Sequence, residues 1–317
     1  MDVWMLILFA FSFLSKTLQS QNTPLNNRPI IGILTQEMPQ NFKEHYTNYN
    51  SYIAASYVKY LEGAGARVAP IWIGKDRLYY KKIISSLNGI LFPGGATLFT
   101  NPAGYAAAGA YLYEYAVKLN NKGNYFPLWG TCLGFELITY LSASQKEIRC
   151  NCSALDQASP LNFRPGFRMS WLFREVPKAI LDALRNEPVT VHYHQFCVTE
   201  KNMTAFGLDK EWRILSTGFD SHGLEFVSSI ESRNFPFYAV MFHPEKNAYE
   251  WKSTKHIPHS NSAIAVMQYF ANFFVNEARK NFNSFPDKGA EASALIYNYP
   301  ATYTGNKSVF EQCYFFT

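Results

Sequence analysis

The chain has 317 residues, of which 48% are hydrophobic and 17% aromatic, and its formal net charge is +5. This apolar content can form a substantial core, and a single domain is reasonable at this length. The small positive charge does not define a partner, and the sequence has no basic run or aromatic platform motif of a nucleic-acid-binding protein. It also has no internal repeat, Walker-type loop or zinc-ligand spacing, so we predict no metal and no cofactor.

Apolar runs and helical patterns alternate along the first half of the chain. The runs that predict buried strands are Ile30–Leu34, Val68–Ile73, Ile90–Phe92 and Phe126–Trp129. The segments that predict helices are Tyr52–Leu61, Leu78–Leu87, Tyr105–Leu119 and Phe135–Leu141. Strands that alternate with helices favour right-handed βαβ units. We therefore expect an α/β fold in which a single domain has a mostly parallel central sheet flanked by helices.

The second half of the chain continues this pattern less regularly. Further strands are predicted at Val189–Val198, Trp212–Leu215, Leu224–Val227 and Tyr238–Phe242. Residues 263–280 carry apolar side chains at helical spacing, which we interpret as a core-packing helix. No element is predicted for residues 145–174, and the proline-containing tail is expected to lie over the surface.

A cysteine between two glycines follows one of the predicted strands. Gly130 and Gly134 flank Cys132, and glycine permits the strained dihedrals of a tight turn from strand to helix. This turn, a nucleophile elbow, would place Cys132 just ahead of a helix N-terminus, where free N–H groups favour a thiolate. The Leu133 N–H is then a natural oxyanion donor. By itself the pattern is weak, because a lone buried cysteine is more often structural.

Two further motifs follow predicted strands and strengthen that interpretation. His243 and Glu245 in His-Pro-Glu come directly after Tyr238–Phe242, and an extended segment would place both on one face, where Glu245 can accept from the ring. Gly94 and Gly95 follow Ile90–Phe92, and their N–H groups can complete an oxyanion hole. Ligands of parallel sheets bind at the carboxyl ends of strands, so the three motifs converge there. Alone, His-Pro-Glu would be interpreted equally well as a surface turn.

Phe-Pro-Gly-Gly, Gly-Thr-Cys-Leu-Gly and His-Pro-Glu, in this order, resemble the class I glutamine amidotransferase-like superfamily. Within it the chain is similar to the γ-glutamyl hydrolase family. The similarity includes segments 28–35, 52–61, 65–68, 129–136, 243–246, 249–252, 273–280 and 303–306, and so covers nearly everything after the leader. It implies a cysteine-type omega peptidase that cleaves the γ-glutamyl amides of folate or antifolate poly-γ-glutamates through a thioester.

The resemblance also implies roles for individual residues. Cys132 is the nucleophile, His243 is its general acid and base, and Glu245 orients the ring. A functionally important histidine of the family falls on His194, although His192 lies two residues before it and is the alternative. From the residues alone, either histidine would equally be a satisfied side chain in a half-buried strand.

The N-terminal segment predicts the compartment. Residues 3–14 are apolar but too short for a comfortable membrane span, so we interpret residues 1–20 as a signal peptide and residues 21–317 as the mature domain. Asparagines 151, 202 and 306 begin N-glycosylation sequons, which agree with a secreted or lysosomal glycoprotein. No later segment predicts a membrane span.

Four cysteines remain once Cys132 is set aside as a free thiol. Cys150, Cys152, Cys197 and Cys313 can form up to two disulfides in three connectivities, or none, and the sequence does not decide between these.

Two other functions remain to be considered beside the hydrolase. A glutaminase that delivers ammonia to a synthase belongs to the same superfamily. The predicted lumenal location argues against this function, and no fused synthase domain is predicted. A non-catalytic binding protein of the same fold has no need to keep Cys132, His243 and Glu245 together. Exo or endo cleavage and the folate-binding residues are not predicted, and the family resemblance implies a homodimer.

Overall fold

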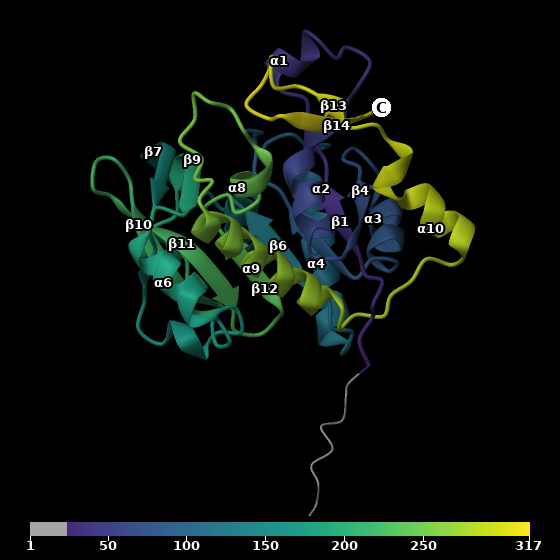
Figure 1. Cartoon of the computed structure of the whole chain (residues 1–317). Coiled ribbons are helices and arrows are strands. Elements are labelled where there is room, and N and C mark those ends of the chain that lie inside the picture. The colour runs from purple at the N-terminus through teal and green to yellow at the C-terminus, as the bar shows by residue number, and fades with distance from the viewer. Residues whose placement is uncertain (1–23) are drawn as a thin grey trace, which may run out of the picture.

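The computed structural model describes residues 24–317, so the predicted signal peptide lies outside the described residues. Its centre is an eight-stranded sheet with the order β4-β1-β5-β6-β12-β11-β10-β8 (Figure 1). These strands are β1 (Ile30–Leu34), β4 (Arg67–Ile71), β5 (Gly89–Phe92), β6 (Leu128–Thr131), β8 (Asn162–Phe163), β10 (Trp212–Phe219), β11 (Glu225–Ser232) and β12 (Phe237–Val240). The pairs from β4 to β12 are parallel and those from β12 to β8 antiparallel. The expected α/β fold with a mostly parallel central sheet is confirmed.

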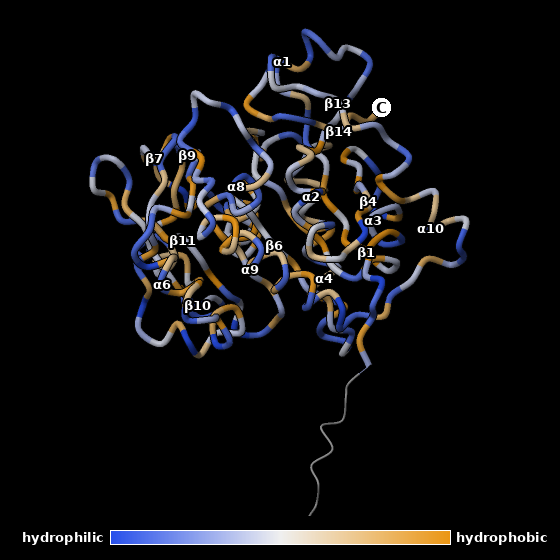
Figure 2. Tube along the Cα trace, in the orientation of Figure 1, coloured by the Kyte–Doolittle hydropathy of each residue, from blue (hydrophilic) through white to orange (hydrophobic). Residues whose placement is uncertain are grey.

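Helices cover both faces of this sheet, because its strands alternate their apolar side chains between two cores. Ile31 and Ile33 of β1 belong to the core under α2, α6 and α9, whereas Ile30 and Leu34 belong to the core under α3, α4 and α5. The helices are α1 (Gln40–Lys43), α2 (Ala55–Glu62), α3 (Arg77–Ile84), α4 (Tyr105–Asn121), α5 (Leu133–Ser142), α6 (Lys178–Asn186), α7 (Glu200–Ala205), α8 (Lys246–Tyr249), α9 (Asn261–Ala278) and α10 (Lys288–Ala294). Peripheral loops are largely hydrophilic (Figure 2).

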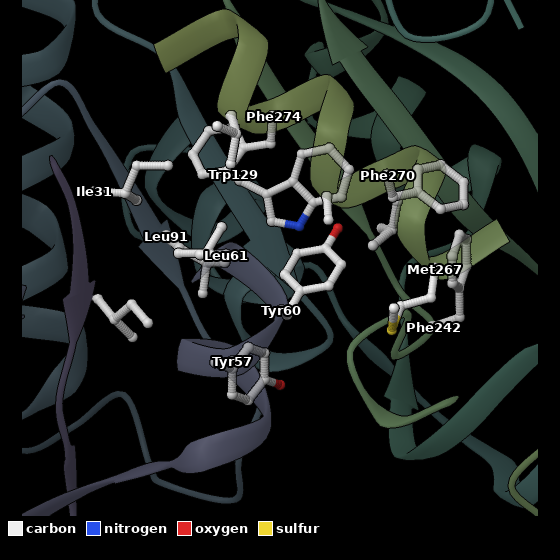
Figure 3. Packing of buried hydrophobic residues seen from close by; sticks show 14 of the residues in the cluster. Ile31, Tyr57, Tyr60, Leu61, Leu91, Trp129, Phe242, Met267, Phe270 and Phe274 are labelled. Carbon is white, nitrogen blue, oxygen red and sulfur yellow. The ribbon is translucent and has the colours of Figure 1, made fainter. Parts of the chain in front are cut away.

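Trp129 of β6 is fully buried at the centre of the first core (Figure 3). Its ring lies 6.2 Å from that of Phe270 and 5.6 Å from that of Phe274, both on α9. Burial of aromatic side chains of this size contributes a few kcal/mol each. The strand that ends at the predicted nucleophile is thereby fixed between sheet and helix, as expected from the apolar spacing of α9.

Two small sheets were not predicted. A four-stranded sheet has the order β13-β14-β3-β2 and contains β2 (Gln36–Glu37), β3 (Ser51–Ala54), β13 (Thr302–Tyr303) and β14 (Gln312–Phe316). The helix predicted to begin at Tyr52 therefore begins at Ala55, because the preceding residues pair with β14 as well as β2. The tail expected on the surface is partly buried: Cys313 and Phe316 of β14 are almost completely inaccessible.

The region for which no element was predicted contributes one of the two strands of a second small sheet, and the predicted strand at Val189–Val198 contributes the other. In it β7 (Cys150–Ser159) pairs antiparallel with β9 (Thr190–Cys197). This pair lies beside the central sheet at the edge near β10 and β11 (Figure 1). Among residues 24–317, no helix has the length and hydropathy that crossing a membrane requires.

Candidate active site

Cys132 lies on a tight turn between β6 and α5. Its φ of 52° and ψ of −108° are uncommon for a residue with a side chain, and backbone strain of this kind concentrates at functional sites. Two hydrogen bonds fix the backbone of Cys132 in this conformation. The Cys132 N–H donates to the Val240 carbonyl at 2.9 Å, and the Cys132 carbonyl accepts from the Glu136 N–H at 3.0 Å. The turn has the geometry of a nucleophile elbow.

The two glycines around Cys132 are required by close backbone contacts. A Cβ on Gly134 would lie 2.0 Å from the Phe92 carbonyl oxygen of β5, and a Cβ on Gly130 would lie 2.6 Å from the Gly134 carbonyl oxygen. Both obstacles are backbone atoms, which cannot move aside as a flexible side chain can. The Gly-x-Cys-x-Gly pattern is thus the sequence form of an elbow packed directly onto the neighbouring strand.

We expect Gly134→Ala to lower the free energy of unfolding by about 3 kcal/mol or more, since the added methyl group overlaps the Phe92 carbonyl. Urea denaturation measures this change. Gly289→Ala is the matched control, because Gly289 lies in the exposed helix α10 and meets only the Asp287 side chain. Equal stability of the Gly134 variant and the wild type would contradict the close packing of the elbow.

His243 and Glu245 form a buried pair just beyond β12. The Nδ1 atom of His243 lies 2.7 Å from Oε1 of Glu245, so Nδ1–H donates to the carboxylate and Nε2 carries the lone pair. The sequence predicted that an extended segment would place these two side chains on one face. Glu245 instead has helical dihedrals at the start of α8, so the pair forms without an extended segment. The backbone of His243 is fixed by its N–H, which donates to the Val191 carbonyl at 2.9 Å.

Gly94 lies where the candidate residues converge. A Cβ on Gly94 would meet Cε1 of His243 at 2.6 Å, the Tyr57 hydroxyl at 2.7 Å and Cβ of Cys132 at 3.0 Å. The structure therefore brings Cys132 and His243 to the same point, at the carboxyl ends of the adjacent strands β5, β6 and β12. The three motifs thus lie together at this edge of the sheet, as expected from the sequence.

The predicted oxyanion donors are not equally free. The Gly94 N–H donates to the Tyr57 hydroxyl at 2.7 Å, which removes it as a donor in this conformation. Within residues 24–317 the Gly95 N–H has no such acceptor, so Gly95 and Leu133 are the stronger pair. The loop is held by Gln36, whose Nε2 donates to the Pro93 and Gly94 carbonyls at 3.1 and 2.9 Å.

Burial sets the protonation of the candidate nucleophile and base. It raises the pKa of Cys132, and the carboxylates of Glu136 and Glu245 raise it further, while the Leu133 N–H and the Lys246 ammonium oppose them. This raised pKa favours the thiol form of Cys132, contrary to the expectation that the helix N-terminus favours a thiolate. Burial also lowers the pKa of His243 below 6.5 against the opposing effect of Glu245, so its ring is neutral and can accept a proton.

His194 lies in a different environment from the other candidates. It is 3% exposed on β9 and does not line the cleft that contains Cys132. Its Nε2 lies 3.1 Å from Nδ1 of His192, and its Nδ1 lies 3.4 Å from Sγ of Cys197. The functional role given to His194 remains a prediction, and the two histidines share one hydrogen-bonded cluster.

One disulfide fixes this cluster. Cys152 and Cys197 are bonded across β7 and β9, with their Cα atoms 5.8 Å apart, while Cys132, Cys150 and Cys313 are free. The sulfur atoms of Cys152 and Cys197 lie with His194 Nδ1 within 4.8 Å of one another. Because the two sulfurs are bonded to each other, they are not available as thiolate ligands for a metal.

We expect stability to fall as the pH drops below 6.5, because burial lowers the pKa of His194 to about 3. The folded state keeps this ring neutral while the unfolded chain binds a proton, so protons favour unfolding between pH 6.5 and 3. At pH 5 this group alone costs about 2 kcal/mol. Urea denaturation at pH 7 and pH 5 should show a smaller loss for His194→Gln than for wild type. An identical loss of stability in both proteins would contradict the lowered pKa of His194 in the folded state.

The three sequon asparagines differ in their surroundings. Asn151 is exposed on β7, and Asn306 is exposed at the rim of the cleft. The amide nitrogen of Asn202 donates to the Ile148 carbonyl at 2.6 Å, so a glycan there would replace an existing hydrogen bond. Glycosylation stays a prediction at all three positions.

Cys132 and His243 open onto a cleft of about 920 Å³. Gly94, Gly95 and Tyr193 also line it. Several contributors were not predicted: Tyr57, which contacts the His243 ring at 3.3 Å, Gln36, which braces the glycine loop, and Lys246, which is 4% exposed beside the pair. Tyr57 has no recognisable signal in the sequence, because it lies within an ordinary apolar helix pattern.

A cysteine on an elbow of a mostly parallel α/β sheet, with a histidine–carboxylate pair at a neighbouring strand end, is the arrangement of a cysteine-type hydrolase with an α/β fold. The sequence profile of the peptidase C26 family matches residues 29–245. The chain belongs to the peptidase C26 family.

Relatives of known name agree with this assignment. The chain is 42% identical to the γ-glutamyl hydrolase of Homo sapiens over 290 residues, which cover 91% of this chain and 90% of the human protein. It is 40% identical to γ-glutamyl hydrolase B of Dictyostelium discoideum over 98% of this chain and 88% of that protein. It is 34% identical to γ-glutamyl hydrolase 1 of Arabidopsis thaliana over 96% of this chain and 87% of that protein.

Proposed function

We propose that this enzyme hydrolyses the γ-glutamyl amide bonds of folate and antifolate poly-γ-glutamates. The observation that supports it most strongly is the meeting of Cys132 and His243 at Gly94, within a chain that matches γ-glutamyl hydrolases over nearly its whole length. The cleft is large enough for an extended ligand, since its 920 Å³ is near the upper end of the roughly 300–1,000 Å³ typical of ligand pockets.

The chemistry follows from the resting protonation states. Nε2 of neutral His243 takes the thiol proton as Sγ of Cys132 attacks the γ-carbonyl carbon, and Glu245 stabilises the imidazolium. The N–H groups of Leu133 and Gly95 hold the oxyanion. His243 then protonates the leaving amine, and a γ-glutamyl thioester remains on Cys132. In the second half, His243 activates a water molecule that releases the γ-carboxylate and restores the thiol.

The proposal includes a lumenal site of action. A disulfide between Cys152 and Cys197 supports an oxidising compartment, as do the predicted leader and sequons. We propose that the mature protein is secreted or lysosomal and forms a homodimer, as implied by the family resemblance. Recovery of the protein from the secreted fraction tests the location, and non-reducing mass spectrometry of it tests for the disulfide. Light scattering tests for the homodimer.

The function is tested by chromatography of the products formed from pteroylpenta-γ-glutamate, with free glutamine as a parallel substrate. Shortened folate chains would support the hydrolase, and their lengths would distinguish exo from endo cleavage. Ammonia released from glutamine alone would instead identify a glutaminase. No product from either substrate would overturn the proposed activity and favour a binding protein.

A further inference from the structure

The cleft around Cys132 has an unbalanced charge. Among residues 24–317, five lysines line it, at positions 43, 246, 252, 255 and 307, whereas Glu37 is the only acidic lining residue. Glu37 is already engaged, because its carboxylate accepts from Thr97, Asn101 and the Tyr105 N–H. The net charge of +5 conceals this concentration, since charges of both signs are spread over the rest of the chain.

Two of these lysines flank one aromatic ring on the cleft wall. The ammonium groups of Lys246 and Lys255 each lie 5.4 Å from the ring centroid of Tyr193. They are therefore no more than roughly 11 Å apart, while standard bond lengths space successive α-carboxylates of an extended γ-glutamyl chain by roughly 6 Å. The two ammonium groups can thus contact carboxylates one or two residues apart on the same chain.

The lysines differ in whether their charge is free to bind a ligand. The Nζ of Lys252 donates to the carbonyls of Gly305 and Ser308, so it stabilises a loop. The nearest carboxylate to the Lys255 ammonium is that of Asp156, at a distance of 3.9 Å, and the Tyr193 ring is its other neighbour. Asp156 already accepts hydrogen bonds from the Tyr193 hydroxyl and from the backbone and ring of His256.

Lys43 and Lys307 belong to another part of the rim. Their ammonium groups form no ion pair or hydrogen bond within the described residues 24–317. Asn41 of α1 donates from Nδ2 to the Lys307 carbonyl at 3.2 Å, which links the two segments that carry these lysines. Figure 1 shows α1 beside the strands β13 and β14 that enclose the Lys307 loop.

We propose that Lys43, Lys255 and Lys307, the outer lysines, bind α-carboxylates of γ-glutamyl residues away from the scissile bond and so make the enzyme select long chains. This inference rests on the proposed function and adds to it the residues that determine chain-length preference. Lys246, beside the reacting groups, is available to substrates of every length, whereas only longer substrates can contact all three outer lysines together. Because the outer contacts are exposed ion pairs, salt weakens them.

The test compares kcat/KM for pteroyl-γ-glutamates with two and with five γ-linked glutamates. The variant carries Lys43→Gln, Lys255→Gln and Lys307→Gln, and the matched control carries Lys122→Gln, Lys201→Gln and Lys288→Gln, which are exposed lysines outside the cleft. Both variants lose three positive charges. Thermal melting of each verifies that the fold is intact.

We expect wild type and control to favour the longer substrate by roughly tenfold at low salt, since each exposed ion pair contributes a few-fold. The outer-lysine variant should lose this preference through a higher KM for the long substrate, with turnover of the short one nearly unchanged. Added salt should lower the preference of wild type toward that of the variant. A preference that survives in the outer-lysine variant would overturn the inference, although hydrolysis of both substrates would still support the proposed function. Failure of wild type to cleave either substrate would overturn the proposed function itself.

Discussion

Replacing Cys132 with alanine is expected to lower hydrolysis of γ-glutamyl amides by roughly a millionfold, which leaves only the residual rate that oxyanion stabilisation and substrate binding provide without the nucleophile. The thiol is the group that bonds to the γ-carbonyl carbon, and no other cysteine lines the cleft. The free energy of unfolding should change by only about 1 kcal/mol, because the β6–α5 turn keeps its backbone hydrogen bonds. Steady-state kinetics and urea denaturation of the same preparation measure both quantities.

Cys150→Ala is the matched control for this variant. Cys150 is a second free thiol, half-buried on β7 and outside the cleft, so its loss should leave kcat/KM unchanged. Substantial activity in the Cys132 variant would eliminate the cysteine mechanism. A large loss of activity in the Cys150 variant would show instead that thiol removal acts through the fold.

His243→Ala is expected to reduce kcat by at least about a thousandfold, because it removes both the base for the thiol and the acid for the leaving amine. The reaction depends strongly on His243 because burial raises the pKa of Cys132, which makes the thiol harder to ionise without a base. Burial keeps the pKa of His243 below 6.5, and wild-type kcat/KM should therefore decline only below pH 6.5. Stopped-assay rates across pH 4 to 8 test both statements.

His259→Ala is the control histidine variant. The His259 ring stacks on Trp251 at 4.0 Å and its Nδ1 contacts the Asn247 carbonyl, outside the cleft. Its removal should leave the pH profile unchanged. Full activity of the His243 variant at neutral pH would contradict the proton-transfer role, whereas parallel loss in both histidine variants would indicate a general effect on folding.

The strands that carry the site could be predicted because they are buried on both faces. Runs such as Ile90–Phe92 and Phe126–Trp129 are continuously apolar, and each is followed directly by a proline or a glycine. The parallel arrangement then brings their carboxyl ends together without further information. The boundaries of these strands moved by at most two residues, and β6 continues to Thr131, directly before the nucleophile.

Features that depend on distant parts of the chain could not be predicted. β3 exists because β14, about 260 residues later, pairs with it, so local helical spacing at Tyr52 was misleading. The choice of Cys152 over Cys150 as the partner of Cys197 depends on a bulge in β7. The resting thiol of Cys132 results from burial and nearby carboxylates, which outweigh the local influence of the helix N-terminus.

The most direct test of the thioester mechanism is to partition the reaction between water and hydroxylamine. Two substrates should be used that share the same γ-glutamyl acyl group but differ in the leaving amine. If both pass through one acyl-enzyme on Cys132, the ratio of γ-hydroxamate to free γ-carboxylate will be identical for the two substrates, and neither product will form with Cys132→Ala. A ratio that changes with the leaving amine would show that no common acyl-enzyme exists and would contradict the mechanism.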